Sequence, residues 1–338
     1  MKLVSYNSDK GYRSGLLINK QVYDLADSAQ AIGLNLPESM LALLKLEEAG
    51  MQSAKQVQTA IEGGEGGVAV PSAELAAPVP DPTSCRDAYA FRQHVATARR
   101  NRGVPMIPEF DQFPIFYFTN HNAVYGGGDV VIEEDHLHKL DFELEAAIIV
   151  GKHGKNISAS QADQYIAGYT IMNDFSARLL QMEEMKLNLG PAKGKDFATT
   201  IGPWLVTPDE LESCRVPGKN GDRYNLRMQA FHNGKQISDG NMQDMNWTFA
   251  EILERVSYGT EIYPGDVIGS GTVGTGCYLE LNGTAALEAK EQGVDFTPTW
   301  LEDRDVIELQ IEGLGTLTNR IVHSGENYSI LAKKKKTE

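Results

Sequence analysis

Short apolar runs separated by turn-forming residues constrain the fold of this chain most strongly. From about residue 85 onward these runs have the length and composition of β-strands, and few windows are strongly helical. They cover residues 115–118, 146–150, 169–172, 204–206 and 306–311. Many strands at short spacing favour a closed or sandwiched β architecture over a doubly wound one. We therefore predict a mainly β (α+β) fold with a short helix at 249–256.

The first 70 residues predict a small, β-rich N-terminal domain. Runs at 3–6, 15–18 and 22–25 are interrupted by Gly, Asn and Asp, which indicates strands joined by tight turns. Residues 37–61 carry apolar side chains at helical intervals. Prolines then mark an extended connection. We expect an N-terminal domain at 1–70, a linker at 71–84, a main domain at 85–330 and a basic tail at 331–338.

Composition excludes several classes of protein. The formal net charge of −15 argues against a nucleic-acid partner, and an anionic substrate would need local positive charge or a metal. No run of 18 apolar residues predicts a membrane span, and the start lacks the apolar centre of a secretion signal, so we expect a cytoplasmic protein. Cys85, Cys214 and Cys277 are too far apart for a metal knuckle, and their odd number argues against a disulfide framework.

Three alternating acids precede the apolar run at 146–150. In a strand, Asp141, Glu143 and Glu145 would point to one face, with Cα atoms about 6.6 Å apart between neighbours in the set. Carboxylates that close repel each other and gain most from a shared cation. A solvated strand face explains the same pattern, so both interpretations stay open at this point.

Two further segments carry polar side chains of interest. Asp174 follows the strand at 169–172, where functional side chains often emerge, although Asp is also common in turns and caps. Asp87 and His94 are seven residues apart, which would place them two turns apart on one face of a helix. A lone His is more often structural, but this one shares its segment with Asp, Arg and Gln.

Six segments resemble successive motifs of the fumarylacetoacetate hydrolase family, in the same order. They are 86–94, 141–145, 173–178, 194–204, 269–272 with Glu280, and 311–319. Any one motif is unspecific, but their joint order over residues 85 to 325 is specific. The first motif and the one around Lys195 resemble the fumarylacetoacetase branch more than the shorter acylpyruvase-like members. The resemblance implies a β-roll main domain and a homodimer.

The resemblance also implies a metal site with only oxygen ligands. The matching positions are Asp87, Glu143, Glu145 and Asp174. Such a ligand set suits Mg²⁺, which we expect, or Ca²⁺ or Mn²⁺, and does not suit zinc. Asp141 falls outside this set, and its role stays open.

Catalytic and substrate-binding positions follow from the same match. His94 corresponds to the family's base, Glu280 to the acid that orients it, and Lys195 to a position that stabilises charge. The positions matching substrate contacts are Tyr89, Tyr117, Arg178, Gln181 and Thr272. Taken alone, Lys195 is typical of an exposed loop, and residues 278–281 have the alternation of a half-buried strand on which Glu280 would face solvent.

The expected function is metal-dependent hydrolysis of a C–C bond in a small β-diketo acid, with fumarylacetoacetate as the first candidate. Acylpyruvate or fumarylpyruvate hydrolysis and oxaloacetate decarboxylation are alternatives on the same fold, and a catalytically silent cation-binding protein is a remote one. The segment after Gln181 has no tyrosine where fumarylacetoacetase has a substrate contact, and the first unit is shorter. Both departures concern the substrate rather than the reaction class.

Overall fold

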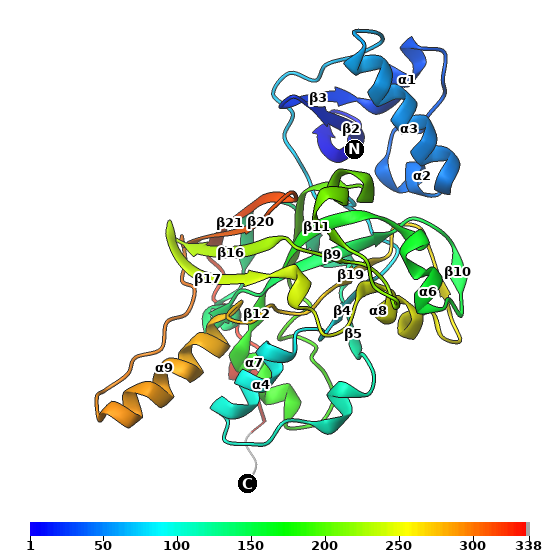
Figure 1. The fold of residues 1–338 in the computed structure, drawn as a ribbon. Helices are drawn as coiled ribbons and strands as arrows, with labels where there is room; N and C mark the ends of the chain where they lie inside the picture. Colours follow the sequence, from blue (N-terminus) through cyan, green and yellow to red (C-terminus); the bar gives the residue numbers. More distant parts are fainter. Residues whose placement is uncertain (336–338) are drawn as a thin grey trace.

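A ten-stranded mixed sheet runs through the described part of the chain, residues 1–335 of the computed structural model (Figure 1). Its strands follow the order β3 (Gln21–Asp24), β2 (Gly11–Ile18), β1 (Lys2–Ser8), β13 (Thr199–Val206), β11 (Ile166–Asp174), β9 (Leu144–Val150), β19 (Val267–Gly269), β4 (Cys85–Ala88) and β5 (Phe116–Thr119). A short strand, β6 (Val124–Tyr125), pairs with β13. The order mixes distant parts of the chain, so neighbouring strands bring together residues that are far apart in sequence.

A second, five-stranded sheet packs against the first. Its order is β17 (Lys235–Asn241), β16 (Arg227–His232), β20 (Val306–Ile311), β21 (Gly315–His323) and β7 (Gly128–Ile132). Two-stranded ribbons join β8 (Leu140–Asp141) to β12 (Ser176–Ala177), β10 (Gly154–Lys155) to β18 (Glu261–Ile262), and β14 (Arg215–Val216) to β15 (Arg223–Tyr224). One apolar cluster contains side chains of both large sheets. The predicted mainly β, α+β fold is confirmed.

Strand β9 is buried on both faces. Ala146, Ile148 and Val150 belong to the cluster between the sheets, whereas Ala147 and Ile149 belong to a second cluster beneath the N-terminal unit. Because successive side chains of a strand point to opposite faces, a strand covered on both sides needs apolar residues at every position. This explains the unbroken apolar run in the sequence.

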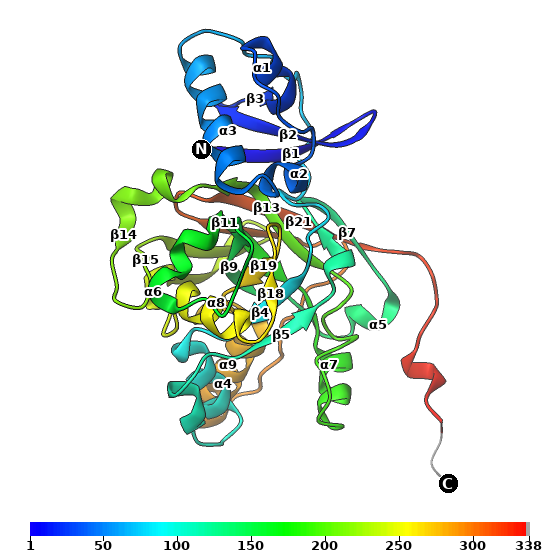
Figure 2. The ribbon, with the colours of Figure 1, turned by 90° about the vertical axis from the view of Figure 1, so that its right-hand side faces the viewer.

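Two groups of helices lie at opposite ends of the molecule (Figures 1 and 2). Helices α1 (Leu25–Ala31), α2 (Met40–Leu44) and α3 (Glu47–Glu62) cover the N-terminal strands, and α4 (Arg92–Asn101), α7 (Arg178–Met185) and α9 (Tyr278–Gln292) lie beyond the opposite side of the sheets. The others are α5 (Glu134–Leu137), α6 (Ala159–Ala162) and α8 (Phe249–Ser257). Helix α8 confirms the one predicted at 249–256, and a capping box between Thr248 and Glu251 fixes its start.

The N-terminal unit departs from the sequence prediction in one respect. The three predicted strands are confirmed, but residues 37–61 form two helices instead of one, and Glu47 lies in the left-handed region with φ of 50°. A continuous helix cannot pass through that conformation. Strand β1 also pairs with β13, so the large sheet continues into the first unit. The division at 1–70, 71–84 and 85–330 stays a prediction.

The last described residues contact the main body. Asp135 of α5 accepts hydrogen bonds from the backbone of Ile330 and Leu331, and Lys334 pairs with Glu183 of α7. Residues 336–338 of the predicted basic tail lie outside the described residues. Across residues 1–335, none of the helices has the length and apolar character needed to cross a membrane.

Candidate active site

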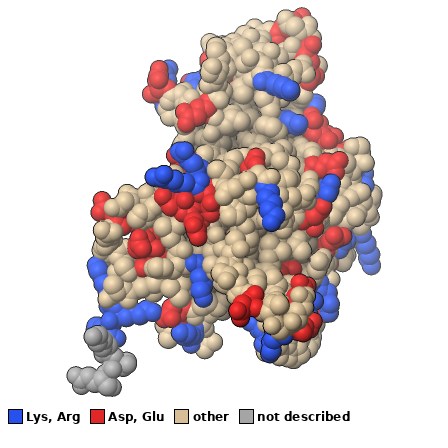
Figure 3. Space-filling model, turned by 90° about the vertical axis from the view of Figure 1, so that its left-hand side faces the viewer, with Lys and Arg blue, Asp and Glu red and all other residues tan. Residues whose placement is uncertain are grey.

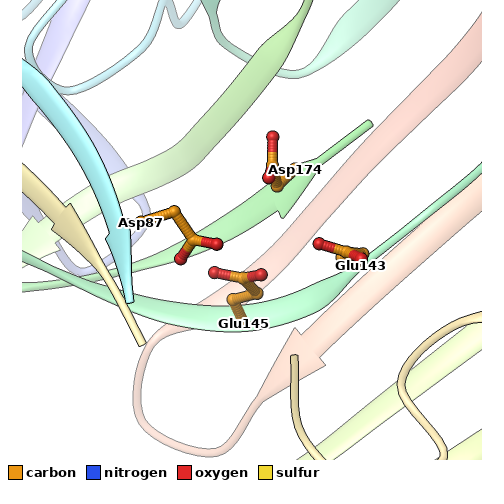
Figure 4. Close-up of side chains that lie close together, drawn as sticks. All are labelled: Asp87, Glu143, Glu145 and Asp174. Carbon is orange, nitrogen blue, oxygen red and sulfur yellow. The ribbon is translucent and has the colours of Figure 1, made fainter. Parts of the chain in front are cut away.

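Four buried carboxylates converge where β4, β9 and β11 meet (Figure 4). Asp87 lies on β4, Glu145 on β9, Asp174 at the end of β11, and Glu143 just before β9. One oxygen from each lies within 4.8 Å of the others. The structure therefore brings together the four acids that the sequence singled out, from three segments of the chain.

Strand pairing explains why these acids meet. Glu145 lies opposite Met172 on β11, and Asp87 lies opposite Gly269 of β19, which in turn pairs with β9. Cys85, two residues before Asp87, and Met172, two before Asp174, both belong to the apolar cluster beneath the N-terminal unit. Since side chains alternate along a strand, the acids project to that same face, at the edge where the cluster ends.

Gly269 is required by this convergence. A Cβ at this position would lie 2.5 Å from Asp87 Oδ1 and 2.8 Å from Glu145 Oε2. Both distances are shorter than real Cβ contacts, so any side chain here would displace the carboxylates. The next backbone turn contributes as well, because the Gly271 N–H donates to Asp87 Oδ1 and Glu145 Oε2 at 3.0 and 3.1 Å.

Asp141, Glu143 and Glu145 alternate with residues of the apolar cluster between the sheets, Phe142, Leu144 and Ala146, as expected for one strand face. All three acids are buried, so the interpretation as a solvated strand face is wrong. Asp141 lies outside the four-carboxylate group, and its carboxylate pairs with Arg178 at 2.7 Å. The regular pairing is interrupted at Phe142 and Glu143, and the Glu143 N–H donates to the side-chain oxygen of Asn173 on β11 instead of to a backbone oxygen. Strand periodicity cannot reveal such a break, because it assumes regular pairing throughout.

Two cations neutralise one side of the cluster. The Lys195 ammonium lies 2.5 Å from Glu143 Oε2 and 2.7 Å from Asp174 Oδ2, and the Arg178 guanidinium lies 2.8 Å from Glu143 Oε1. Burial alone would raise the pKa of Glu143, but Lys195 and Arg178 outweigh it and lower that pKa to about 2. Lys195 is buried, so the interpretation as an exposed loop residue is wrong.

For the other carboxylates, nearby positive charge does not offset the effect of burial on the pKa. Burial, followed by the negative charge of Asp174, raises the pKa of Asp87 to about 7, and burial together with Asp87 raises that of Glu145 well above its usual range. Among the described residues, Glu145 Oε1 and Asp174 Oδ1 are buried without a hydrogen-bond partner. Unpaired buried oxygens in an all-carboxylate set fit a hard divalent cation such as Mg²⁺, Ca²⁺ or Mn²⁺.

A histidine–carboxylate pair lies beside this cluster. His94 Nδ1 is 2.6 Å from Glu280 Oε2, and both side chains are buried. His94 lies on a helix as expected, but the sequence placed Asp87 and Glu280 in the wrong elements. Asp87 and His94 do not share a helix, because Asp87 lies on β4 and His94 in the first turn of α4; Glu280 lies in the first turn of α9 instead of on a strand.

The predicted substrate contacts surround the two groups. Tyr117 of β5 donates its hydroxyl hydrogen to Asp174, and Tyr89 lies edge-on to His94 with ring centroids 5.9 Å apart. Gln181 Oε1 accepts from Arg178 at 3.0 Å, and Thr272 is buried in the turn after β19. Their roles toward a substrate remain proposals.

One supporting residue escaped the sequence analysis. The carboxylate of Glu184 on α7 accepts hydrogen bonds from the backbone N–H groups of Ala192, Lys193 and Gly194, at 3.0, 2.6 and 3.2 Å. These contacts hold the segment that leads into Lys195. An acid on a surface helix gives no sequence signal for such a role, because the contact depends on how the following loop folds back.

Comparison with known proteins agrees with this geometry. The family model described as fumarylacetoacetate (FAA) hydrolase, C-terminal, matches residues 83–322. The chain belongs to the fumarylacetoacetate hydrolase family. That match covers every residue of the carboxylate cluster and of the histidine–carboxylate pair.

Individual relatives differ in the reactions that their names give. A fumarylacetoacetase from Arabidopsis thaliana is 32% identical over 268 residues, 64% of this chain and 63% of that protein. The human mitochondrial oxaloacetate tautomerase FAHD2A is 29% identical over 224 residues, 66% of this chain and 62% of its own. The chain thus spans less than two thirds of either relative. The family includes hydrolases and tautomerases.

A solved structure supports the fold over almost the whole chain. The fumarylacetoacetate hydrolase from Exiguobacterium antarcticum superposes with a TM-score of 0.66 and 23% identity, covering 96% of this chain and 99% of that one. At this level of identity the likeness extends to the fold and not to the substrate.

Proposed function

We propose that this protein is a metal-dependent hydrolase that cleaves a C–C bond of a β-diketo acid, with fumarylacetoacetate, split into fumarate and acetoacetate, as the first candidate substrate. The observation that carries this proposal is the pairing of two devices: a buried four-carboxylate site and, next to it, His94 hydrogen-bonded to Glu280. A cation site alone suits enolate chemistry. A positioned base beside it suits the activation of water.

Asp87, Glu143, Glu145 and Asp174 would hold the cation. When bound there, a divalent cation acts as a Lewis acid toward substrate oxygens and stabilises negative charge on them. Hard cations of this kind prefer carboxylate oxygens, which agrees with the absence of Cys and His from the cluster.

His94 would remove a proton from water, whose oxygen then bonds to one carbonyl carbon of the substrate. Glu280 fixes the imidazole by its contact with Nδ1, so that Nε2 is the nitrogen that accepts the proton. When the C–C bond breaks, its electron pair stays with the departing carbon, which becomes an enolate and finally takes up a proton. The products are a carboxylic acid and a ketone.

Lys195 would stabilise the oxyanion that forms at the attacked carbonyl. An ammonium has three N–H donors, and contacts with Glu143 and Asp174 use two of them. One donor is left for a substrate oxygen. Loss of one such donor typically slows a reaction by about 10²–10³.

A second candidate function is tautomerisation of oxaloacetate, favoured by the human relative's name. This reaction moves a proton between carbon and oxygen and needs a base, but no attack by water. Acylpyruvate or fumarylpyruvate hydrolysis and oxaloacetate decarboxylation use the same site. A protein that only binds cations would not need His94 and Glu280 to be paired.

A panel of substrates distinguishes these functions. Fumarylacetoacetate, two acylpyruvates and oxaloacetate are each incubated with the Mg²⁺-loaded protein, and products are separated by chromatography. We expect cleavage of a diketo acid into an acid and a ketone. Loss of the oxaloacetate enol absorbance without new products would favour the tautomerase, and release of CO₂ the decarboxylase. No change in any substrate would support the silent cation-binding protein.

Other properties of the protein remain proposals. We propose that it acts on a small molecule without nucleic acid, and on the face shown in Figure 3 Lys and Arg side chains lie among acidic ones. A cytoplasmic location stays a prediction, and the human relative is named as mitochondrial.

A further inference from the structure

Asp141 lies between the two devices of the site without belonging to either. Its side chain is fully buried, and its Oδ2 lies 2.8 Å from the Arg178 Nε and 2.9 Å from the Leu279 N–H. Its Oδ1 accepts from the Tyr278 N–H at 2.7 Å and from the Phe142 N–H at 2.9 Å. One carboxylate therefore holds both a guanidinium and the start of a helix.

The contact with Arg178 connects Asp141 to the carboxylate cluster. Arg178 reaches Asp141 and Glu143 with the same guanidinium, at 2.7 and 2.8 Å. A buried, planar guanidinium that bridges two carboxylates fixes their relative position more rigidly than an ammonium could. The position of Asp141 thus limits where Glu143 can lie.

The contact with the start of α9 connects Asp141 to the histidine–carboxylate pair. Tyr278 and Leu279 are the first two residues of α9, and their N–H groups have no partner within the helix. The residue at the N-cap, Cys277, makes no side-chain capping hydrogen bond, so Asp141 caps the helix from another part of the chain. Glu280 follows at once and contacts His94. Asp141 therefore also limits where the imidazole can lie.

We propose that Asp141 is a positioning residue that fixes the His94–Glu280 pair relative to the carboxylate cluster. The proposal rests on the proposed function, because it assigns the pair to proton transfer. One carboxylate then determines the relative position of the carboxylate cluster and the His94–Glu280 pair. A change at Asp141 should therefore disturb proton transfer without removing any group that touches the substrate. Supporting residues of metal sites typically contribute about 10–100-fold in activity or metal affinity.

Asp24 offers a matched control within the same chain. It is also buried, accepts from the N–H of Asp27 at the start of α1, and pairs with Arg13 at 2.6 Å. Like Asp141, it caps a helix and pairs with an arginine, but it lies in the N-terminal unit, away from the site. Asp24→Asn and Asp141→Asn should both lower the melting temperature, but only Asp141→Asn should alter catalysis.

The experiment compares kinetics and a spectroscopic signature in the Mg²⁺-loaded, full-length protein. For Asp141→Asn we expect a roughly 10–100-fold lower kcat with KM changed less than about threefold. We also expect loss of the downfield proton resonance of the His94 Nδ1–H, in protein labelled with ¹⁵N-histidine, with the resonance retained in Asp24→Asn. The double variant Asp141→Asn/Glu280→Gln should lose little more than the slower single one.

Several results would overturn the proposal. They are an unchanged kcat, an unchanged His94 resonance, or additive losses in the double variant. If Asp141→Asn does not fold, Asp141→Ser retains a small acceptor for the helix and removes the partner of Arg178, and the same readouts apply. The resonance does not depend on turnover, so it tests the positioning of His94 even if the substrate panel contradicts the proposed hydrolysis.

Discussion

His94 and Glu280 are 186 residues apart in the sequence, yet their Nδ1 and Oε2 atoms lie 2.6 Å apart in the fold. The contact forms because α4 and α9, which carry these residues in their first turns, pack against each other. The second Glu280 oxygen accepts from the Thr275 N–H at 3.0 Å, which prevents the carboxylate from rotating away. Such a pair holds the imidazole in one orientation and one tautomer.

Replacement of His94 should separate proton transfer from metal binding. We expect His94→Ala to lower kcat/KM for diketo-acid hydrolysis by about 10²–10⁴, the usual contribution of general acid–base catalysis. Cation affinity, measured by calorimetry, should change little because His94 is not a proposed ligand. Glu280→Gln should lower the rate too, with little further loss in the double variant. Near-normal hydrolysis by His94→Ala with metal bound would show that another group activates water.

Removal of metal should lower both activity and stability. Without a cation, the buried carboxylates repel one another, and a ligand that binds only the folded state stabilises it by mass action, by about 2.7 kcal/mol at a concentration 100 times its Kd. We expect EDTA to abolish turnover and lower the melting temperature, and Mg²⁺ or Mn²⁺ to restore both. Glu143→Gln should behave like the chelated protein. Full activity of a metal-stripped sample would exclude the metal site.

The stability of the metal-free protein should depend on pH in an unusual direction. Burial and the neighbouring Asp174 raise the pKa of Asp87 to about 7, whereas its ordinary value is 3.8. Between these values the folded state binds more protons than the unfolded state, so the free energy of unfolding falls as pH rises. Urea denaturation in EDTA should therefore show lower stability at pH 7.5 than at pH 5. Asp87→Asn should flatten this dependence; a rise in stability over the same range would contradict it.

Gly269 should tolerate no side chain. In Gly269→Ala, the new Cβ would collide with Asp87 and Glu145, so the carboxylates must shift. Overpacking of this kind costs about 1–3 kcal/mol of stability, and displacement of ligands by about 1 Å can cost about 10²-fold in rate. Gly63→Ala is the control, since Gly63 ends α3 with a negative φ and a new Cβ there would approach neighbouring atoms no closer than 3.3 Å. Equal effects of the two substitutions on metal affinity would refute the steric argument.

The expected homodimer can be tested directly. The expectation rests on the resemblance to the family, and light scattering coupled to size exclusion at working concentration measures it. We expect a mass near twice that of the 37.1 kDa chain. A monomer mass across the accessible concentration range would show that this chain departs from the expected assembly.

The sequence alone determined the class of the fold and the identity of the acidic residues. Apolar alternation and turn residues are local properties, so the strands at 146–150, 169–172 and 306–311 and the helix at 249–256 followed from short windows of sequence. The order of six motifs also identified Asp87, Glu143, Glu145 and Asp174, which the structure places together.

Only the tertiary structure decided how these residues are presented. The interruption at Phe142, the helix that carries Glu280, and the separation of Asp87 from His94 into a strand and a helix all contradicted local patterns. Each is set by contacts with distant segments: Asn173 orders the backbone at Glu143, and Asp141 caps α9 across 137 residues of sequence. A pattern of a few residues carries no information about contacts with distant segments. In the sequence, a carboxylate that caps a distant helix looks like any other acid on a strand.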